Sequence, residues 1–423
     1  MPADLNVVVL AAGEGKRLTG QTPKVLTPLW GVPALCWPVD AALGLNPRRL
    51  IVVAGPRPEP ARAALAGRDA VIVTQERAEG TGAAVLLARS ELDKGPGPLL
   101  VLFGDGPLVD TALLERLLDD HAASGAAITV LTADLDDPAG YGRVLRDERG
   151  ALVSIVEERD ADPATRAVRE INSGVWVIER SPCLDDLSAV GRTNAQAEVY
   201  LTDLVAIARE RGRKVGASKC ADARQVLGFN DQRELAAVRA LLRRRILERH
   251  LLAGVEIVDP ESTWIDATVS IEPGARILPA TVIEGRCRIA AGCEVGPFAH
   301  LRTGTELDAG AEVGNFTETK QTRLGAGAKA KHLSYLGDAT IGARANIGAG
   351  TITANYDGRT KHPTTVGERA FIGSGTVLVA PVSVGDQATT GAGAIVTRHS
   401  QVGAGETWVG VPARKLRGPG AKP

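Results

Sequence analysis

Two different hydrophobic patterns divide the chain. From residue 6 to about residue 228, short apolar runs rich in Val, Ile and Leu alternate with segments of helical periodicity. Because these runs are continuously apolar, they are typical of strands buried on both faces of a sheet. Their alternation with helices predicts a doubly wound, mostly parallel α/β sheet. The runs are residues 6–10, 50–54, 70–74, 98–105, 126–132 and 173–178.

The helical segments have recognisable limits. Residues 111–124 form one predicted helix, with Thr111 as the expected N-cap. Residues 232–252 form a longer one, in which Leu235, Val238 and Leu242 recur at helical spacing. Three consecutive arginines at 243–245 would suit a nucleic-acid surface, but a solvated helix face explains them better.

The second pattern has a period of six residues. Aliphatic residues stand at every sixth position from Ile271 to Val313 and, with one threonine among them, from Val366 to Val402. A repeated hexapeptide is the signature of a parallel β-helix, in which each repeat supplies one flat face. Three faces close a coil, so residues 260–410 predict about eight stacked coils. We therefore predict an α/β domain at 1–228, a linker helix at 229–252 and a β-helix domain at 253–423.

The period of six breaks once, between about Thr353 and Thr365, in TANYDGRTKHPTT. The flanking repeats keep their phase across the gap. A coil therefore continues past the insertion, which we expect to project from the solenoid as an arm.

Composition excludes several classes of function. The formal net charge is −1, which argues against a nucleic-acid or membrane partner held by bulk electrostatics. Five cysteines without a CxxC pair indicate neither a disulfide framework nor a zinc site. The first apolar run lacks the flanks of a signal peptide, and no run is long enough to span a bilayer. The expected location is the cytoplasm, without membrane insertion.

Candidate chemistry lies at the ends of the predicted strands. Residues 11–17 form a Gly-rich loop with basic residues that would suit phosphates, although the loop matches neither the P-loop nor the dinucleotide fingerprint. Lys24 is a second cation just downstream. Asp105 follows a buried strand, at the end of a parallel sheet where ligands bind, and its carboxylate suits Mg²⁺.

At this point the sequence resembles a known family. The motifs of the first half, which are similar to those of sugar-1-phosphate nucleotidyltransferases, are LAAGEGKRL, PKVL, GTG, GDGPL, GYGR, IVEE, EINSG and GFND. The motifs of the second half are VGPFAHLR, GNFTETK, KAKHLSYLGD, NIGAGTITANYDG and FIGSGTVLVAPV. Together they resemble the bacterial bifunctional N-acetylglucosamine-1-phosphate uridyltransferases and glucosamine-1-phosphate N-acetyltransferases over nearly the whole chain.

The resemblance implies a fold and an activity. It implies a Rossmann-like nucleotidyltransferase domain and a left-handed parallel β-helix. The implied activity is a two-step synthesis of UDP-N-acetylglucosamine, a precursor of the cell wall and lipopolysaccharide. Acetyl-CoA acetylates glucosamine 1-phosphate, and UTP then donates its uridylyl group with Mg²⁺ as the cofactor. The implied partners are these small molecules and two further copies of the chain in a homotrimer.

The resemblance also implies site residues. For uridylyl transfer, the implied catalytic cations are Arg17 and Lys24, and the implied metal ligands are Asp105 and Asn230. The implied UTP and UDP-N-acetylglucosamine contacts are Ala11, Ala12, Gly13, Lys24, Gln75, Gly80, Thr81, Gly142, Glu157, Asn172 and Asn230. For acetyl transfer, the implied base is His332. The implied glucosamine 1-phosphate contacts are Arg302, Lys320, Tyr335, Asn346 and Lys361. The implied acetyl-CoA contacts are Ala349, Asn355, Tyr356, Ser374, Ala392 and Arg414, with Glu318 in a supporting role.

Two alternatives stay open from the sequence. One is a sugar-1-phosphate nucleotidyltransferase and acetyltransferase of broader specificity. The other is a non-catalytic regulatory subunit of the same architecture. Such subunits typically lose the loop cations and the metal ligand, whereas Arg17, Lys24 and Asp105 are all present here.

Overall fold

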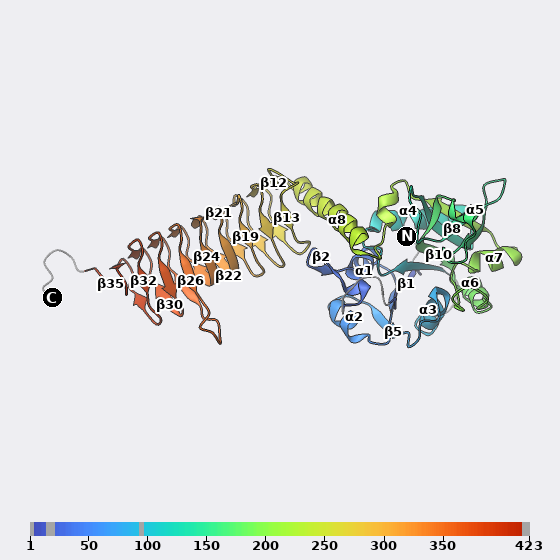
Figure 1. Cartoon of the computed structure of the whole chain (residues 1–423), viewed down its shortest axis with the longest axis horizontal. Helices are drawn as coiled ribbons and strands as arrows, with labels where there is room; N and C mark the ends of the chain where they lie inside the picture. Colours follow the sequence, from blue (N-terminus) through green and yellow to red (C-terminus); the bar gives the residue numbers. More distant parts are fainter. Residues whose placement is uncertain (1–3, 14–21, 93–96, 417–423) are drawn as a thin grey trace. The chain divides into compact units, whose positions relative to one another are not determined.

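The computed structural model describes residues 4–13, 22–92 and 97–416. The chain divides into two compact units, Met1–Arg239 and Ala240–Pro423. The division falls inside helix α8 (Gln232–Leu252), whose bounds agree with the predicted helix (Figure 1). The domain limits at residues 228 and 252 stay a prediction.

The first unit is built on a mixed sheet. Its main strand order is β11-β7-β10-β6-β1-β4-β5, with a β8–β9 hairpin beside β10. The pairs β1–β4, β4–β5, β1–β6 and β11–β7 are parallel, as the apolar runs predicted, whereas β10 runs antiparallel to both of its neighbours in this order. The strands are β1 (Asn6–Ala11), β4 (Arg49–Ala54), β5 (Val71–Thr74), β6 (Pro98–Phe103), β7 (Ile128–Asp134), β8 (Arg143–Arg146), β9 (Leu152–Val156), β10 (Glu170–Glu179) and β11 (Val215–Lys219). A separate two-stranded sheet pairs β2 (Pro28–Leu29) with β3 (Val32–Pro33).

Helices cover both faces of this sheet. Along β1, Val7 and Val9 belong to one apolar core, while Val8 belongs to the other, because successive side chains alternate across a strand. The first core contains residues of α1 (Cys36–Leu43), α2 (Glu59–Ala64) and α4 (Thr111–Ser124). The second contains residues of α3 (Thr81–Leu87), α6 (Arg180–Leu187) and α7 (Leu204–Glu210). The short elements are α5 (Pro163–Arg166), η1 (Lys24–Leu26), η2 (Ala88–Ser90) and η3 (Ala223–Val226).

Helix α4 has the predicted bounds but a different cap. Asp110, not Thr111, is the N-cap, and its carboxylate accepts a hydrogen bond from the amide of Leu113 at 2.9 Å. Asp110 has the extended backbone that an N-cap needs. The hydroxyl of Thr111 instead donates to Ala41 O of α1 at 2.9 Å, so the predicted cap holds two helices together.

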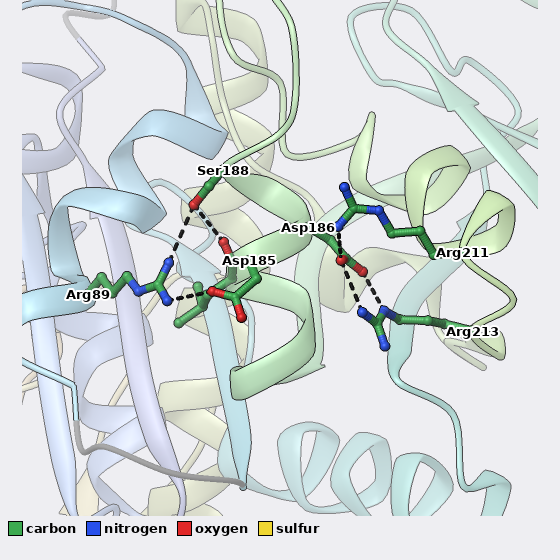
Figure 2. Close-up of polar contacts among 7 residues, drawn as sticks. Arg89, Asp185, Asp186, Ser188, Arg211 and Arg213 are labelled. Carbon is green, nitrogen blue, oxygen red and sulfur yellow. Dashed lines mark hydrogen bonds and ion pairs between the residues drawn. The ribbon is translucent and has the colours of Figure 1, made fainter.

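A buried carboxylate fixes helix α6. Asp186 has no exposed side-chain surface and accepts hydrogen bonds from Arg211 and Arg213, just beyond α7 (Figure 2). Burial alone would raise the pKa of Asp186, but the two arginines outweigh it and lower the pKa. On the same helix, the exposed Asp185 pairs with Arg89 of η2 at 2.6 Å.

The second unit is a left-handed parallel β-helix with three faces, each a ladder of short parallel strands. The first face contains β12 (Glu256–Ile257), β15 (Arg276–Ile277), β18 (Glu294–Val295), β21 (Glu312–Asn315), β23 (Lys329–His332), β25 (Asn346–Ile347), β28 (Phe371–Ile372), β31 (Thr389–Thr390) and β34 (Thr407–Val409). The terminal strand β35 (Arg414–Lys415) pairs antiparallel with β34.

The second and third faces share two longer strands. The second contains β13 (Trp264–Ile265), β16 (Val282–Ile283), β19 (His300–Leu301), β26 (Ile352–Ala354), β29 (Val377–Val379) and β32 (Ile395–Val396). The third contains β14 (Ser270–Ile271), β17 (Arg288–Ile289), β20 (Glu306–Leu307), β27 (Thr364–Val366), β30 (Val382–Val384) and β33 (Gln401–Val402). Strands β22 (Glu318–Leu324) and β24 (Tyr335–Ile341) turn the corner between these faces and pair on both.

The predicted period of six marks the core of this prism. Ile277, Ile283 and Ile289 are buried, one from each face of a coil. All five cysteines of the chain are free and buried, and Cys287 and Cys293 belong to this core. No helix in the described residues combines the length and the apolar character needed to cross a bilayer.

Candidate functional sites

The first candidate site lies where several loops leave the sheet of the first unit. Asp105 follows β6, and Gly104 at this turn donates its amide to Leu10 O of β1 at 2.8 Å. Gln75 follows β5 and is buried, and its backbone N–H donates to Ala54 O at the end of β4 at 2.8 Å. The carboxyl ends of neighbouring strands therefore bring distant sequence segments together, as expected for an α/β sheet.

Lys24 joins the two predicted metal ligands. The side chain of Lys24 is 9% exposed, and its Nζ donates to Asp105 Oδ2 and, at 2.8 Å, to Asn230 Oδ1. A carboxylate oxygen and an amide oxygen thus converge on a single positive charge. Both are hard oxygen donors of the kind that Mg²⁺ takes, so the residues fit the implied metal. Among the described residues, no group of three or more acidic, His or Cys side chains is placed to hold a metal ion.

Two adjoining cavities open around Lys24. The first has a volume of about 400 Å³ and the second about 270 Å³. Residues shared by both are Lys24, Thr81, Phe103, Asp105, Glu198 and Asn230. Predicted residues that line the first cavity but not the second are Ala12, Gly13, Gln75 and Gly80. Predicted residues that line only the second are Gly142, Glu157 and Asn172. Ala11 is buried in β1 and lines a neighbouring cavity of about 580 Å³, and Arg17 lies outside the described residues.

The first cavity depends on a glycine. Gly80 has a φ of 100°, and a Cβ there would lie 2.4 Å from Val199 O. No other residue fits this approach without a shift of the backbone. Thr81 Oγ1 then accepts a hydrogen bond from the amide of Leu201 at 3.0 Å, which fixes the wall between the cavities.

The second cavity carries a carboxyl with altered acidity. Burial raises the pKa of Glu157, although a hydrogen bond from Thr202 at 3.1 Å opposes the shift. Asn172 Oδ1 accepts a hydrogen bond from Trp176 Nε1 at 3.1 Å, and the backbone N–H of Asn172 donates to Gly142 O at 2.9 Å. Glu157, Asn172 and Gly142 therefore line one wall in fixed orientations.

Sequence reasoning missed several residues of these cavities. They are Tyr141, Ser173, Gln196, Glu198 and Tyr200. Ser173 and Tyr141 stand inside quoted motifs and were within reach of the sequence. The segment around Glu198 carries no glycine or strand-end signal, and only the fold brings it to the cavity.

The second candidate site lies on the β-helix. Most of the predicted phosphate contacts gather at the edge between the second and third faces, which we call the arm edge because the arm leaves the prism there. Lys320 lies beside Lys361 of the arm, and the proximity of the two ammonium groups lowers the pKa of Lys320. Arg302 lies near Lys320 on the preceding coil, and its guanidinium donates to Glu318 Oε1 at 2.8 Å. Three facing cations make a cradle suited to a phosphate.

The base of the arm, at Asn355, packs against Tyr335 and Gly337. Tyr335 pairs in register with Glu318 of the neighbouring coil. Gly337 packs under Tyr335 and Asn355 so closely that a Cβ would lie 2.6 Å from either side chain. Asn355 Nδ2 donates to Asp338 Oδ2, while Tyr356 is 61% exposed. Asp338 is a contact that sequence reasoning missed.

The predicted base lies on a different edge. His332 ends β23, at the edge between the first and second faces, which we call the His332 edge. Its Nδ1 lies 3.1 Å from Asn315 Oδ1 on the preceding coil. With this amide oxygen as the acceptor, Nδ1 carries the proton and Nε2 keeps its lone pair. Asn315 was quoted in a motif but not predicted to act.

Three of the predicted acetyl-CoA contacts, Ala349, Ser374 and Ala392, continue the same edge. Backbone hydrogen bonds link each coil to the next along this edge. Gly350 donates to His332 O at 3.4 Å, and Gly375 donates to Ala349 O at 2.7 Å. On the following coil, Gly393 donates to Ser374 O at 2.7 Å. The column is therefore His332, Ala349, Ser374 and Ala392. Arg414 lies beyond it in β35 and is exposed, and Asn346 lies on the first face between Lys329 and Phe371, away from the cradle.

Comparison with known proteins places the chain in a family. Residues 7–253 match the model of the MobA-like NTP transferase domain, and residues 363–398 match that of the hexapeptide repeat of succinyl-transferase. A "Bifunctional protein GlmU" of Pelobacter propionicus is 43% identical over 94% of this chain and 94% of its own length. Another, of Pelotomaculum thermopropionicum, is 43% identical over 90% of both chains. The chain belongs to the GlmU family.

Membership of the GlmU family decides the class of protein. The chain is a bifunctional enzyme with a nucleotidyltransferase domain and a hexapeptide-repeat acetyltransferase domain, and it carries out the two-step synthesis of UDP-N-acetylglucosamine. Its substrates are small molecules, a nucleotide among them. A solved structure of a putative glucose-1-phosphate thymidylyltransferase from Bacillus anthracis matches 56% of this chain and 94% of its own, at 19% identity and a TM-score of 0.47.

Proposed function

We propose that this member of the GlmU family performs its two reactions at two separate sites: uridylyl transfer at the paired cavities around Lys24, and acetyl transfer on the β-helix. The observation that supports the proposal is the grouping of the chemistry. Oxygen donors and a buried cation converge in one unit, while a cradle of cations and a hydrogen-bonded histidine occur in the other.

The uridylyl transfer needs positioning and charge neutralisation. UTP occupies the first cavity, with its base against Gln75 and Gly80, and N-acetylglucosamine 1-phosphate occupies the second, beside Glu157 and Asn172. A phosphate oxygen of the sugar attacks the α-phosphorus, the bond to the β-phosphate breaks, and pyrophosphate leaves. Lys24 neutralises charge that develops on the phosphates, and we propose that Arg17 does the same.

The implied metal of this site is Mg²⁺, held by Asp105 and Asn230. When bound, it neutralises negative charge on the phosphates. Lys24 contacts both proposed ligands, so the same side chain serves the metal site and the nucleotide. The orientation of Asp105 is fixed by the turn at Gly104, which ties β6 to β1.

The acetyl transfer needs a base and a held substrate. The phosphate of glucosamine 1-phosphate rests in the cradle of Arg302, Lys320 and Lys361. The amine nitrogen attacks the thioester carbon of acetyl-CoA, its proton passes to His332 Nε2, and the carbon–sulfur bond breaks. The proton then passes to the departing thiolate. Coenzyme A lies along the column from Ala349 to Ala392.

A homotrimer would complete this second site. Within one chain, His332 and the cradle lie on opposite edges of the second face, so a neighbouring copy must bring its own edge alongside. The His332 edge carries a stripe of exposed apolar residues, Phe298, Phe316 and Leu333, which are 53%, 58% and 62% exposed. The rings of Phe298 and Phe316 stack with centroids 5.3 Å apart. Exposed apolar surface of this kind marks a contact with another protein surface.

The proposed location is the cytoplasm, where the free state of all five cysteines is stable. The decisive test is a reconstitution from purified protein with glucosamine 1-phosphate, acetyl-CoA, UTP and Mg²⁺. We expect UDP-N-acetylglucosamine, with N-acetylglucosamine 1-phosphate accumulating when UTP is omitted. Failure to form the acetylated intermediate would refute the proposal for the β-helix, and failure of uridylyl transfer would refute it for the first unit.

A further inference from the structure

The arm of the β-helix is a short hairpin. Tyr356 and Lys361 pair antiparallel, and the amide of His362 donates to Asn355 O at 2.8 Å. Asn355 and Lys361 therefore belong to opposite sides of one hairpin. Any motion of the hairpin as a body displaces both residues together.

Asp357 organises the turn of this hairpin. Its amide donates to Thr360 O at 3.2 Å, and its Oδ1 accepts from the amides of Arg359 at 2.9 Å and Thr360 at 2.8 Å. Its Oδ2 accepts from His362 Nε2 at 2.8 Å and from Arg398 at 2.9 Å. Both carboxylate oxygens thus have two donors, and these hydrogen bonds, first among them that of the Thr360 amide, hold the pKa of Asp357 well below its usual range.

Arg398 ties the turn to the body of the prism. It follows β32, two coils beyond the coil that carries the arm. Its Nε donates to Ala380 O at 3.0 Å, on the intervening coil, while its other end reaches Asp357. A single guanidinium therefore connects the arm to two later coils.

We propose that Asp357 and Arg398 are positioning residues for acetyl transfer, because their ion pair latches the arm to the prism. The inference rests on the proposed function, in which Asn355 and Lys361 of the arm contact the substrate. An isolated surface ion pair contributes little to stability. This pair differs because Asp357 also closes the turn, so the hairpin and its anchor form one network.

The latch predicts a particular kinetic signature. If the arm is released, only a fraction of the molecules has Lys361 in place beside Lys320 and Arg302 at any moment. The apparent affinity for glucosamine 1-phosphate is the intrinsic affinity multiplied by that fraction, whereas saturating substrate draws every molecule back to the competent arm. Loss of the latch therefore raises KM and leaves kcat nearly unchanged.

The test compares Asp357→Asn, Arg398→Gln and Arg398→Lys in the full-length protein, with acetyl transfer followed by thiol release from acetyl-CoA. We expect the first two variants to raise KM for glucosamine 1-phosphate about five- to tenfold and to change kcat less than about twofold. Arg398→Lys keeps a donor and a charge, so KM should return to within about twofold of wild type. The matched control is Glu368→Gln, which removes an ion pair with Arg344 at another edge of the same coil.

A second measurement reports on the arm itself. Trypsin cleaves after Arg359 and Lys361, so a released arm should be cut about tenfold faster in Asp357→Asn than in wild type. Faster cleavage with an unchanged KM, or a loss of kcat alone, would overturn the inference. So would an equal rise of KM in Glu368→Gln. If wild type does not acetylate glucosamine 1-phosphate at all, the proposed function fails instead, and the cleavage rates still report whether the latch exists.

Discussion

The two units build their sites in opposite ways. In the first unit, loops from separate strands enclose adjoining cavities, and Lys24 links Asp105 to Asn230 inside a single chain. In the β-helix, most coils repeat the one before them, and most of the predicted residues are divided between the arm edge and the His332 edge. An irregular sequence can fold around a ligand, whereas a periodic one makes flat faces. The periodic unit therefore needs an insertion, and in our proposal also a neighbouring copy, to make a site.

Replacing His332 should have the largest effect, because it should abolish the activity of one unit and leave the activity of the other unchanged. His332→Asn keeps a polar side chain of similar size but removes the base, so acetyl transfer should fall about a thousandfold. Uridylyl transfer to N-acetylglucosamine 1-phosphate should be unchanged, because it uses the other unit. Initial rates of both reactions on the same preparation measure the effect. Parallel loss of both activities would contradict independent sites.

The converse change is Asp105→Asn. It removes the negative charge from one proposed metal ligand and from the partner of Lys24, so uridylyl transfer should fall by roughly two to three orders of magnitude. Acetyl transfer should continue at the wild-type rate. In a titration with Mg²⁺, the variant should reach half of its maximal rate at a higher Mg²⁺ concentration than wild type. An unchanged magnesium dependence would argue against Asp105 as a ligand.

Mixed assemblies test the shared site directly. Neither His332→Asn nor Lys320→Ala should acetylate efficiently alone. Co-expressed at equal levels, they should recover about a quarter of wild-type activity, if each site takes its base from one copy and its cradle from another. The matched pair in the first unit, Lys24→Met with Asp105→Asn, should show no recovery of uridylyl transfer. No recovery in the first pair would mean that one chain holds the whole acetyl transfer site.

The smallest expected effect concerns stability. Asp186→Asn should lower the free energy of unfolding of the first unit by about 2 kcal/mol, because a buried carboxylate with two arginine donors is lost. Asp185→Asn on the same helix breaks only the exposed pair with Arg89, and should cost less than about 1 kcal/mol (Figure 2). The temperature at which uridylyl transfer activity is lost, compared between each variant and wild type, reports the change in stability.

The same carboxylate gives a pH dependence with a definite sign. The pKa of Asp186 is lowered in the folded state. Its contribution is therefore fully present above the unfolded pKa of about 3.9 and is lost as the pH falls through the folded pKa. The stability difference between wild type and Asp186→Asn should be constant near neutral pH and shrink in acid. A difference that grew in acid would contradict the lowered pKa.

Local features were predictable where the physics is local. The bounds of α4 and α8 follow from apolar periodicity, and the coils follow from the period of six. The cap of α4 was predicted wrongly, because Asp110 and Thr111 are both good caps and their surroundings decide between them. The antiparallel direction of β10 was not predicted either, since a buried strand is apolar in either direction.

The sequence by itself determined the class of both units and most of the chemistry, because strand runs, hexapeptides and motif residues are written in consecutive positions. Tertiary structure alone decided which residues meet. Lys320 faces Lys361, Asn315 orients His332, and Arg398 reaches Asp357. These pairs are 41, 17 and 41 residues apart, and the stacking of coils sets their distances. No local sequence pattern indicates such a contact, because each residue is compatible with its own strand or loop whether or not the distant partner is present.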